Sequence, residues 1–135
     1  MYKRQEFDHT RYADFAALMQ ARLAVEARVF PVAEQSLREL LDSTDDVALQ
    51  EIARQRLARI LAQQDRAEEG LELFSSPVSG AELTASREEV RGDLLVSLGR
   101  NDEARAAYQA AVDALTDASA RPQLQLKLDD LAEEA

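Results

Sequence analysis

The stretch GDLLVSLGRNDEARAAYQAA, residues 92–111, decides the fold of this 135-residue chain. Two segments with apolar residues at helical spacing flank Gly99, and glycine ends a helix in the left-handed conformation without steric cost. Small residues at Gly92 and Ala104 let two antiparallel helices approach closely. Tyr108, four positions after Ala104, is placed to fill the gap to the neighbouring pair. The stretch therefore predicts a tightly packed helical hairpin.

The same skeleton recurs earlier in the chain, where Ala33 and Gly70 occupy places equivalent to Ala104. The intervals between these three residues match or come close to the period of about 34 residues that is typical of the tetratricopeptide repeat. In that repeat, stacked helix pairs bury a continuous core. We predict an all-α, tetratricopeptide-repeat-like solenoid of three antiparallel helix pairs, with repeats at about 12–42, 46–76 and 80–116. The alternative is a generic antiparallel bundle whose alanines reflect an alanine-rich composition.

Apolar spacing and turn residues predict seven helices. They cover about residues 11–29, 31–41, 47–64, 67–74, 79–98, 101–115 and 122–133. Phe15, Leu18, Ala21 and Val25 form one stripe of the first helix, and Ser79 with Glu82 has capping-box spacing for the fifth. Residues 1–11 are expected to be a lead-in outside the core of domain 12–135. Residues 121–133 are expected to cap the stack with Leu124, Leu128 and Leu131 on one face, although the alternation over 124–128 also fits a strand.

Composition argues against an enzyme. The chain has no cysteine and a single histidine, His9, which excludes thiolate nucleophiles and leaves a metal site or catalytic triad without partners. Neighbouring acids such as Glu88 and Glu89 point in different directions on a helix, so they cannot act as facing carboxylates. The net charge of −10 argues against nucleic acid or an anionic membrane surface as a direct partner. We predict a non-catalytic chain without cofactor or metal.

A tetratricopeptide stack binds partners in its concave face, which the first helix of each pair lines. Projecting that rule onto the sequence gives the candidate partner-binding residues Phe15, Leu18, Arg22, Val25, Ile52, Gln55, Arg59, Glu89, Asp93 and Val96. Arg22 and Arg59 fall at equivalent places, one repeat apart, where guanidinium groups can hold a carboxylate or a peptide backbone. The alternatives are that both arginines pair with neighbouring acids and that Phe15 and Leu18 contact the second helix in the core.

Several short motifs carry a narrower resemblance. They are Leu57-Ala58-Arg59 with Ala67 and Leu71, Arg91-Gly92-Asp93 with Leu95 and Gly99, Ala104-Arg105 with Tyr108, and Pro122 with Leu128-Asp129-Asp130-Leu131. Over about residues 12–131 the chain resembles the periplasmic domain of the YfgM family, the tetratricopeptide-like ancillary subunits of the bacterial Sec translocon. The resemblance implies an inner-membrane protein that faces the periplasm and links SecYEG to a PpiD-type chaperone during protein export.

The resemblance also implies one transmembrane helix. The chain has no apolar run of the roughly 18–20 residues that a membrane span needs, so we expect an anchor upstream of Tyr12 in a longer protein. The alternative is a soluble cytoplasmic tetratricopeptide scaffold of an unrelated complex. A further expectation is homo-oligomerisation through the exposed apolar edge of the first helix.

Overall fold

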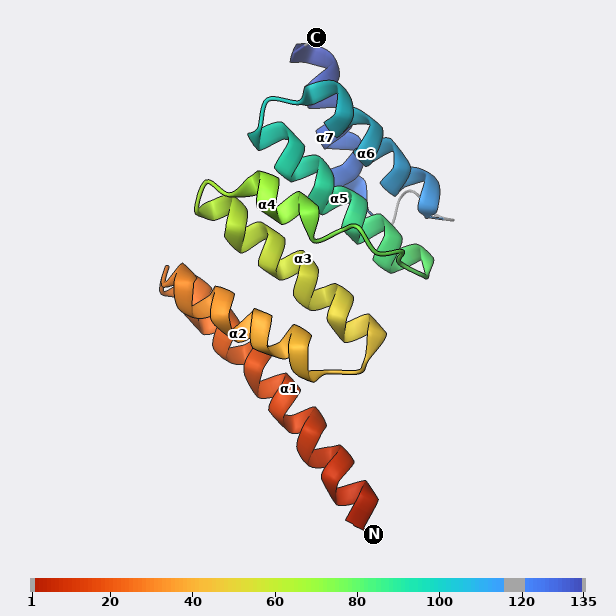
Figure 1. Cartoon of the computed structure of the whole chain (residues 1–135). Helices are drawn as coiled ribbons and strands as arrows, with labels where there is room; N and C mark the ends of the chain where they lie inside the picture. Colours follow the sequence, from red (N-terminus) through yellow and green to blue (C-terminus); the bar gives the residue numbers. More distant parts are fainter. Residues whose placement is uncertain (1, 116–120, 135) are drawn as a thin grey trace.

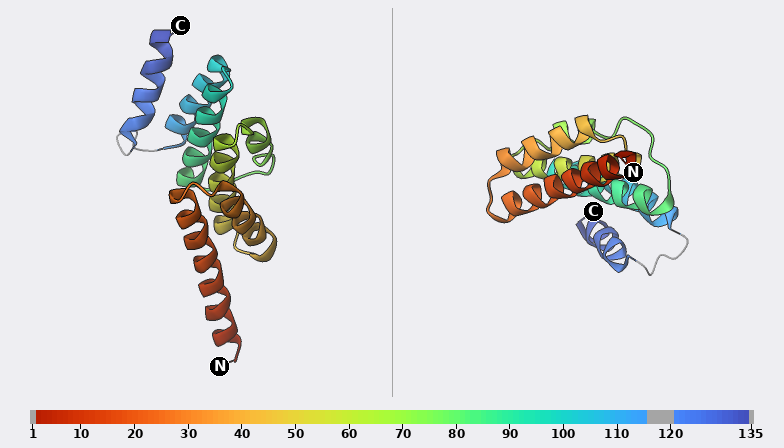
Figure 2. Two further views of the ribbon diagram at one scale, coloured as in Figure 1. Left: turned by 90° about the vertical axis from the view of Figure 1, so that its left-hand side faces the viewer. Right: turned by 90° about the horizontal axis from the view of Figure 1, so that it is seen from below.

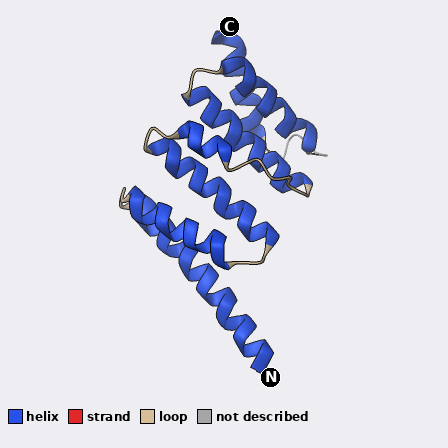
Figure 3. Cartoon of the chain, viewed as in Figure 1, coloured by secondary structure: helices blue, strands red, loops and turns tan. Residues whose placement is uncertain are grey.

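The computed structural model describes residues 2–115 and 121–134, with side chains described for 11–115 and 121–133. This part of the chain contains helices and no strand (Figure 3). The helices are α1 (Tyr2–Glu26), α2 (Phe30–Ser43), α3 (Val47–Gln63), α4 (Ala67–Glu72), α5 (Ala81–Ser97), α6 (Asn101–Ala114) and α7 (Pro122–Glu134). The all-α prediction is confirmed, and the strand alternative for residues 124–128 is wrong.

The first six helices form three antiparallel pairs, α1 with α2, α3 with α4 and α5 with α6, stacked in chain order (Figure 1). Each of these helices contacts the next along the chain, and α3 also packs on α5. The last helix, α7, contacts α6 and lies on the same side of the stack as α1, away from α2 (Figure 2). This arrangement is the predicted solenoid of three pairs with a capping helix.

The turns inside the three pairs repeat with the spacing that the sequence predicts. Arg28, Asp65 and Gly99 each follow the first helix of a pair with positive φ angles of 61°, 62° and 75°. The two intervals between these turn residues equal those that separate the small residues Ala33, Gly70 and Ala104. A left-handed residue of this kind closes the last helical turn. The repeat is therefore present in the backbone as well as in the pattern of small side chains.

Close approach between helices explains two of the glycines. A Cβ atom added to Gly92 would lie 2.3 Å from Cε1 of Tyr108, and one added to Gly70 would lie 3.0 Å from the carbonyl oxygen of Ala58. Ala104 is completely buried at the corresponding place in the third pair. Small residues at these positions are thus required by the packing of one helix against the next.

The core is divided along the stack. Leu37, Leu57 and Leu61 are completely buried where α1, α2 and α3 meet. At the other end Leu124 and Leu131 of α7, which are 1% and 4% exposed, complete the cluster around α5 and α6. The prediction that the C-terminal helix caps the stack through one apolar face is confirmed.

Helix ends differ from the predictions in several places. The first helix begins at Tyr2, not at Arg11. The capping box at Ser79 is wrong, because Gly80, with φ 93°, is the N-cap of α5 and no side chain caps it. The fourth helix ends at Glu72, so Phe74 lies in the loop that follows, although its ring is buried.

The alternative that Phe15 contacts the second helix in the core is wrong. Phe15 is 64% exposed, whereas Ala21 and Ala24 are the buried residues that face α2. At 100° per residue Phe15 lies about 120° around the helix from Ala21, which carries its ring away from the core. Leu18, for which the same alternative was open, does pack partly against the first cluster.

Candidate functional site

An apolar cavity opens between α1 and α3 on the face formed by the first helices. Its volume is about 420 Å³, and its apolar wall includes Val25, Leu37 and Ile60. Arg22 and Arg59, both predicted from the sequence, line it together with the unpredicted Arg56. In a chain with a net charge of −10, this cavity therefore combines an apolar wall with three guanidinium groups and one carboxylate, that of Glu26.

The three arginines differ in their intramolecular partners. Arg22 donates to Glu26 at 3.3 Å, and Arg59 donates to Oδ2 of Asp93 at 2.9 Å. Among the described residues, the exposed Arg56 has no ion pair or side-chain hydrogen bond. Arg56 precedes Arg59 by three residues, and residues at this spacing lie side by side on a helix. The sequence could therefore have predicted Arg56 as a further residue of this face. Arg56 is thus the arginine most available to a ligand.

Other predicted residues line neighbouring hollows of the same face. Ile52, Gln55, Arg59 and Glu89 meet in a cavity of about 190 Å³ between α3 and α5. Phe15 and Leu18 line a third cavity, of about 480 Å³, beside the loop that joins α2 to α3. Val96 is 39% exposed on α5. The structure therefore distributes the predicted residues along the face and does not gather them in one pocket.

Asp93 is the centre of a polar network at the C-terminal end of this face. Its carboxylate accepts hydrogen bonds from Oη of Tyr108 at 2.6 Å and from Nζ of Lys127 at 2.9 Å, in addition to the bond from Arg59. Burial by itself raises the pKa of Asp93, but these hydrogen bonds and the charges of Lys127 and Arg59 hold the pKa below its ordinary value. Burial and the Asp93 carboxylate raise the pKa of the Tyr108 hydroxyl.

Helix α5, which carries Asp93, also carries Glu89. This residue is 6% exposed, and its carboxylate accepts from Arg121 at 2.9 Å and from Lys127 at 2.8 Å. Two cations from the region of α7 thus neutralise the acidic end of the predicted groove. Sequence periodicity gave no signal for them, because neither belongs to a helix pair. The part of the face left open lies between α1 and α3.

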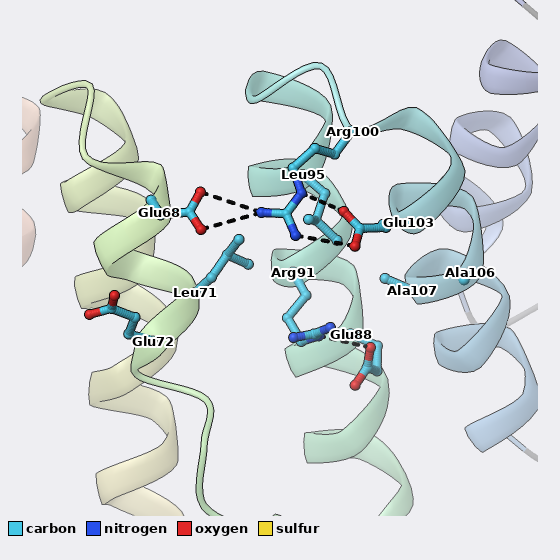
Figure 4. A pocket seen from close by; sticks show the side chains of 10 residues that line it. All are labelled: Glu68, Leu71, Glu72, Glu88, Arg91, Leu95, Arg100, Glu103, Ala106 and Ala107. Carbon is cyan, nitrogen blue, oxygen red and sulfur yellow. Dashed lines mark hydrogen bonds and ion pairs between the residues drawn. The ribbon is translucent and has the colours of Figure 1, made fainter.

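A cleft of about 460 Å³ between α4, α5 and α6 has a different character (Figure 4). Leu71 and Leu95 form part of its floor, while Arg100 bridges Glu68 of α4, at 3.3 Å, and Glu103 of α6. Exposed ion pairs of this kind contribute little free energy. At the equivalent place of the preceding repeat, Arg66 pairs with Glu34 of α2, at 2.9 Å, and with Glu69 of α4. This repetition indicates a tie between neighbouring helices.

The described residues contain no group of three or more histidine, cysteine, aspartate or glutamate side chains that could hold a metal ion. The His9 side chain lies outside the described side chains. No helix among the described residues is long and apolar enough to cross a membrane.

Comparison with known proteins identifies the family. A family model described as a tetratricopeptide repeat-like domain matches residues 3–133. The chain belongs to this tetratricopeptide repeat-like family. No solved structure matches the chain.

Three similar proteins carry the same name, ancillary SecYEG translocon subunit. The protein from Neisseria gonorrhoeae is 32% identical over 128 residues, which cover 94% of this chain and 61% of the relative. Those from Aggregatibacter actinomycetemcomitans and Escherichia coli are 30% and 27% identical over 104 and 121 residues, covering 77% and 90% of this chain. The chain spans 50% and 58% of these two relatives. Membership of the YfgM family, predicted from the motifs of the helix pairs, is confirmed.

Proposed function

We propose that this chain is the protein-binding repeat domain of a non-catalytic translocon subunit, and that it docks a partner in the cavity between α1 and α3. The single observation that carries the location is the combination of an apolar wall with the arginines Arg22, Arg56 and Arg59. Apolar side chains of a partner segment supply burial there, and the guanidinium groups hold its carboxylates or backbone carbonyls. The names of the three relatives support SecYEG as the assembly to which the domain contributes.

Binding to purified SecYEG in proteoliposomes tests this proposal. The double variant Arg22→Glu with Arg56→Glu is expected to weaken binding at least about tenfold, since it reverses two charges at the cavity. Arg38→Glu is the control for charge reversal outside the cavity, because Arg38, like Arg22, is an ion-paired surface arginine, 43% exposed, but lies on α2. Equal loss in both variants, or unchanged affinity in a folded double variant, would contradict the cavity as the docking site.

The finer part of the proposal is that the domain faces the periplasm and connects the translocon with a PpiD-type chaperone. A cysteine-free chain allows a direct test of the compartment, because Val47→Cys introduces a single thiol at a position that is 72% exposed. In cells that express the full-length native protein with this change, and with any cysteine outside this chain replaced by serine, a membrane-impermeant maleimide should label the thiol without lysis. Labelling only after lysis would contradict the periplasmic location and favour a cytoplasmic scaffold.

The chaperone link is tested by capture. The domain is expected to retain the purified chaperone and SecYEG together, and the cavity variant is expected to lose one of them. Capture of SecYEG alone by the unaltered domain would leave the translocon role standing and remove the chaperone from the proposal.

A further inference from the structure

The cavity of about 480 Å³ beside the loop from α2 to α3 is acidic, whereas the cavity between α1 and α3 is basic. The acidic one is lined by three apolar side chains and three carboxylates, those of Phe15, Leu18, Leu49, Asp14, Asp45 and Asp46. We call it the aspartate cavity. We call the cavity that contains Arg22, Arg56 and Arg59 the arginine cavity.

Two carboxylates of the aspartate cavity are not used within the described chain. Asp46 caps α3, because its Oδ1 accepts a hydrogen bond from the backbone N–H of Leu49 at 3.1 Å. In contrast, Asp14 and Asp45 make no ion pair or side-chain hydrogen bond among the described residues. Arg11, which also lines this cavity, already has an interaction within the chain. Two carboxylates are therefore left to attract a cation.

The arginine cavity contains one guanidinium group in the same situation. Glu26 accepts a hydrogen bond from Arg22 at 3.3 Å, and Asp93 accepts one from Arg59 at 2.9 Å. The exposed Arg56 has neither an ion pair nor a side-chain hydrogen bond within the part of the chain that the structure describes. Each cavity thus offers uncompensated charge, negative in one and positive in the other.

The two cavities follow one another along the same side of α1. At 100° per residue Asp14, Leu18 and Arg22 lie within an arc of about 80°, and one turn, about 6 Å, separates Leu18 from Arg22. Helix α3 runs in the same direction as α1 (Figure 1) and carries Leu49 near its start and Arg56 seven residues later. We call the two cavities together the bipolar face, because it is apolar throughout, acidic at one end and basic at the other.

We propose that the bipolar face binds an amphipathic segment of the partner protein that carries a cation at one end and a carboxylate at the other. This inference rests on the proposed function, since it specifies the partner segment that docks in the arginine cavity. The cation lies at Asp14 and Asp45, beside the ring of Phe15, whose face also attracts a cation. The carboxylate lies at Arg56, and apolar side chains between the two charges cover Leu18.

The spacing of the two charges follows from the helices. Eight residues separate Asp14 from Arg22 on α1, and ten separate Asp46 from Arg56 on α3, so the two ends stand about 12–15 Å apart. A partner helix spans that distance with about eight to ten residues. A uniformly acidic or uniformly basic segment meets like charge at one end, which costs affinity, so the face selects a segment with both charges.

Binding to purified SecYEG in proteoliposomes tests the acidic end. The double variant Asp14→Lys with Asp45→Lys is expected to weaken binding at least about tenfold, because it places two cations where the partner's cation lies. Asp102→Lys with Asp130→Lys is the matched control. It changes the net charge by the same amount, but these two aspartates are exposed on α6 and α7. The control should bind within about twofold of the unaltered chain. Circular dichroism establishes that both variants fold.

The aromatic ring is tested separately. Phe15→Ala is expected to weaken binding at least about fivefold. Tyr12→Ala is its control, because Tyr12 is 73% exposed on the same helix but lines neither cavity. Equal loss in the two single variants would overturn the placement of the cation at Phe15.

The outcomes separate this inference from the proposed function. If Arg22→Glu with Arg56→Glu weakens binding and Asp14→Lys with Asp45→Lys does not, the bipolar face is overturned and the arginine cavity remains the docking site. If neither variant weakens binding, both proposals fall. A self-associated chain in sedimentation that Asp14→Lys with Asp45→Lys dissociates would identify a second copy as the occupant and overturn the inference.

Discussion

The ion pair between Glu51 of α3 and Arg87 of α5 makes a sharp prediction about stability. Their side chains are 3% and 6% exposed, and the Arg87 guanidinium donates to both Glu51 oxygens, at 2.5 and 2.9 Å. Arg87 also donates to the carbonyl oxygen of Ser76, at 2.5 Å, in the loop after α4. The substitution Arg87→Met keeps an apolar stem of similar length and removes all of these donors. This substitution tests whether the Glu51–Arg87 ion pair stabilises the packing of the second repeat against the third.

The magnitude follows from what stays beside Glu51. Removing one partner of a buried ion pair costs about 3–5 kcal/mol, because the other charge stays buried without compensation. Gln55 still donates to Glu51 at 3.0 Å, and Arg54 lies 3.6 Å away, so we expect the lower end of that range. For a chain of this length that loss lowers Tm by about 10 °C. The double variant Glu51→Leu with Arg87→Met removes both charges and should cost less than the single one.

Urea unfolding followed by circular dichroism measures these differences. Arg38→Met is the control, because Arg38 of α2 is 43% exposed and makes partly exposed surface ion pairs with Glu34 and Glu69, so its loss should cost less than about 1 kcal/mol. The reasoning would be refuted if Arg87→Met cost no more than this control, or if the double variant were as unstable as the single one.

The contribution of this ion pair to stability also depends on pH. Burial by itself raises the pKa of Glu51, but hydrogen bonds from Arg87 and Gln55 hold this pKa below its ordinary value of 4.5. The ion pair therefore contributes to the free energy of unfolding above pH 4.5, and this contribution is lost as the pH falls through the lowered pKa.

Three further predictions concern the packing of the third repeat. Gly92→Ala should destabilise the chain by about 1–3 kcal/mol, because the added methyl group clashes with Tyr108. Gly80→Ala should destabilise it less, because nothing lies within 4 Å of an added Cβ atom there and only the positive φ angle opposes a side chain. Equal urea midpoints for the two variants would contradict the close approach of Gly92 to Tyr108. Asp93→Asn should speed hydrogen exchange of α7 amides, because its ion pair with Lys127 is lost, and unchanged exchange would contradict the tether. In the unaltered chain the pKa of Asp93 lies below its ordinary value of 3.8, so the ion pair between Asp93 and Lys127 is intact above pH 3.8. Protease cleavage before α7 should increase only as the pH falls through this lowered pKa.

Much of the fold was predictable because it depends on local and repeated constraints. Gly99 must adopt a left-handed conformation, Pro122 is tolerated in a helix only in the first turn, and the residue at position 92 must leave room for the ring of Tyr108. Each of these requirements restricts residue type at one position, and the repeat period makes some of them recur along the chain. The residues of the third helix pair were therefore informative about the family as well as the fold, and the comparisons confirm both predictions.

The site was less predictable, because two of its determinants are long-range. Lys127 reaches Asp93 across a sequence separation of 34 and Arg121 reaches Glu89 across one of 32, and no periodic pattern specifies the direction of such contacts. The exposure of Phe15 has another cause. A helix with apolar residues on two sides satisfies the periodicity with either side inward, so the sequence pattern alone does not decide which stripe faces the core.

These two failures concern opposite ends of the stack, and together they explain where a partner can bind. At the C-terminal end α7 and the residue before it supply cations to Glu89 and Asp93, so the acidic part of the face is already satisfied from within the chain. At the N-terminal end no later helix covers the cavity between α1 and α3, and Arg56 there makes no ion pair among the described residues. Free energy of binding is gained where apolar surface and charge are still uncompensated. A ligand should therefore engage the first two repeats, and variants of the third repeat should change stability more than affinity.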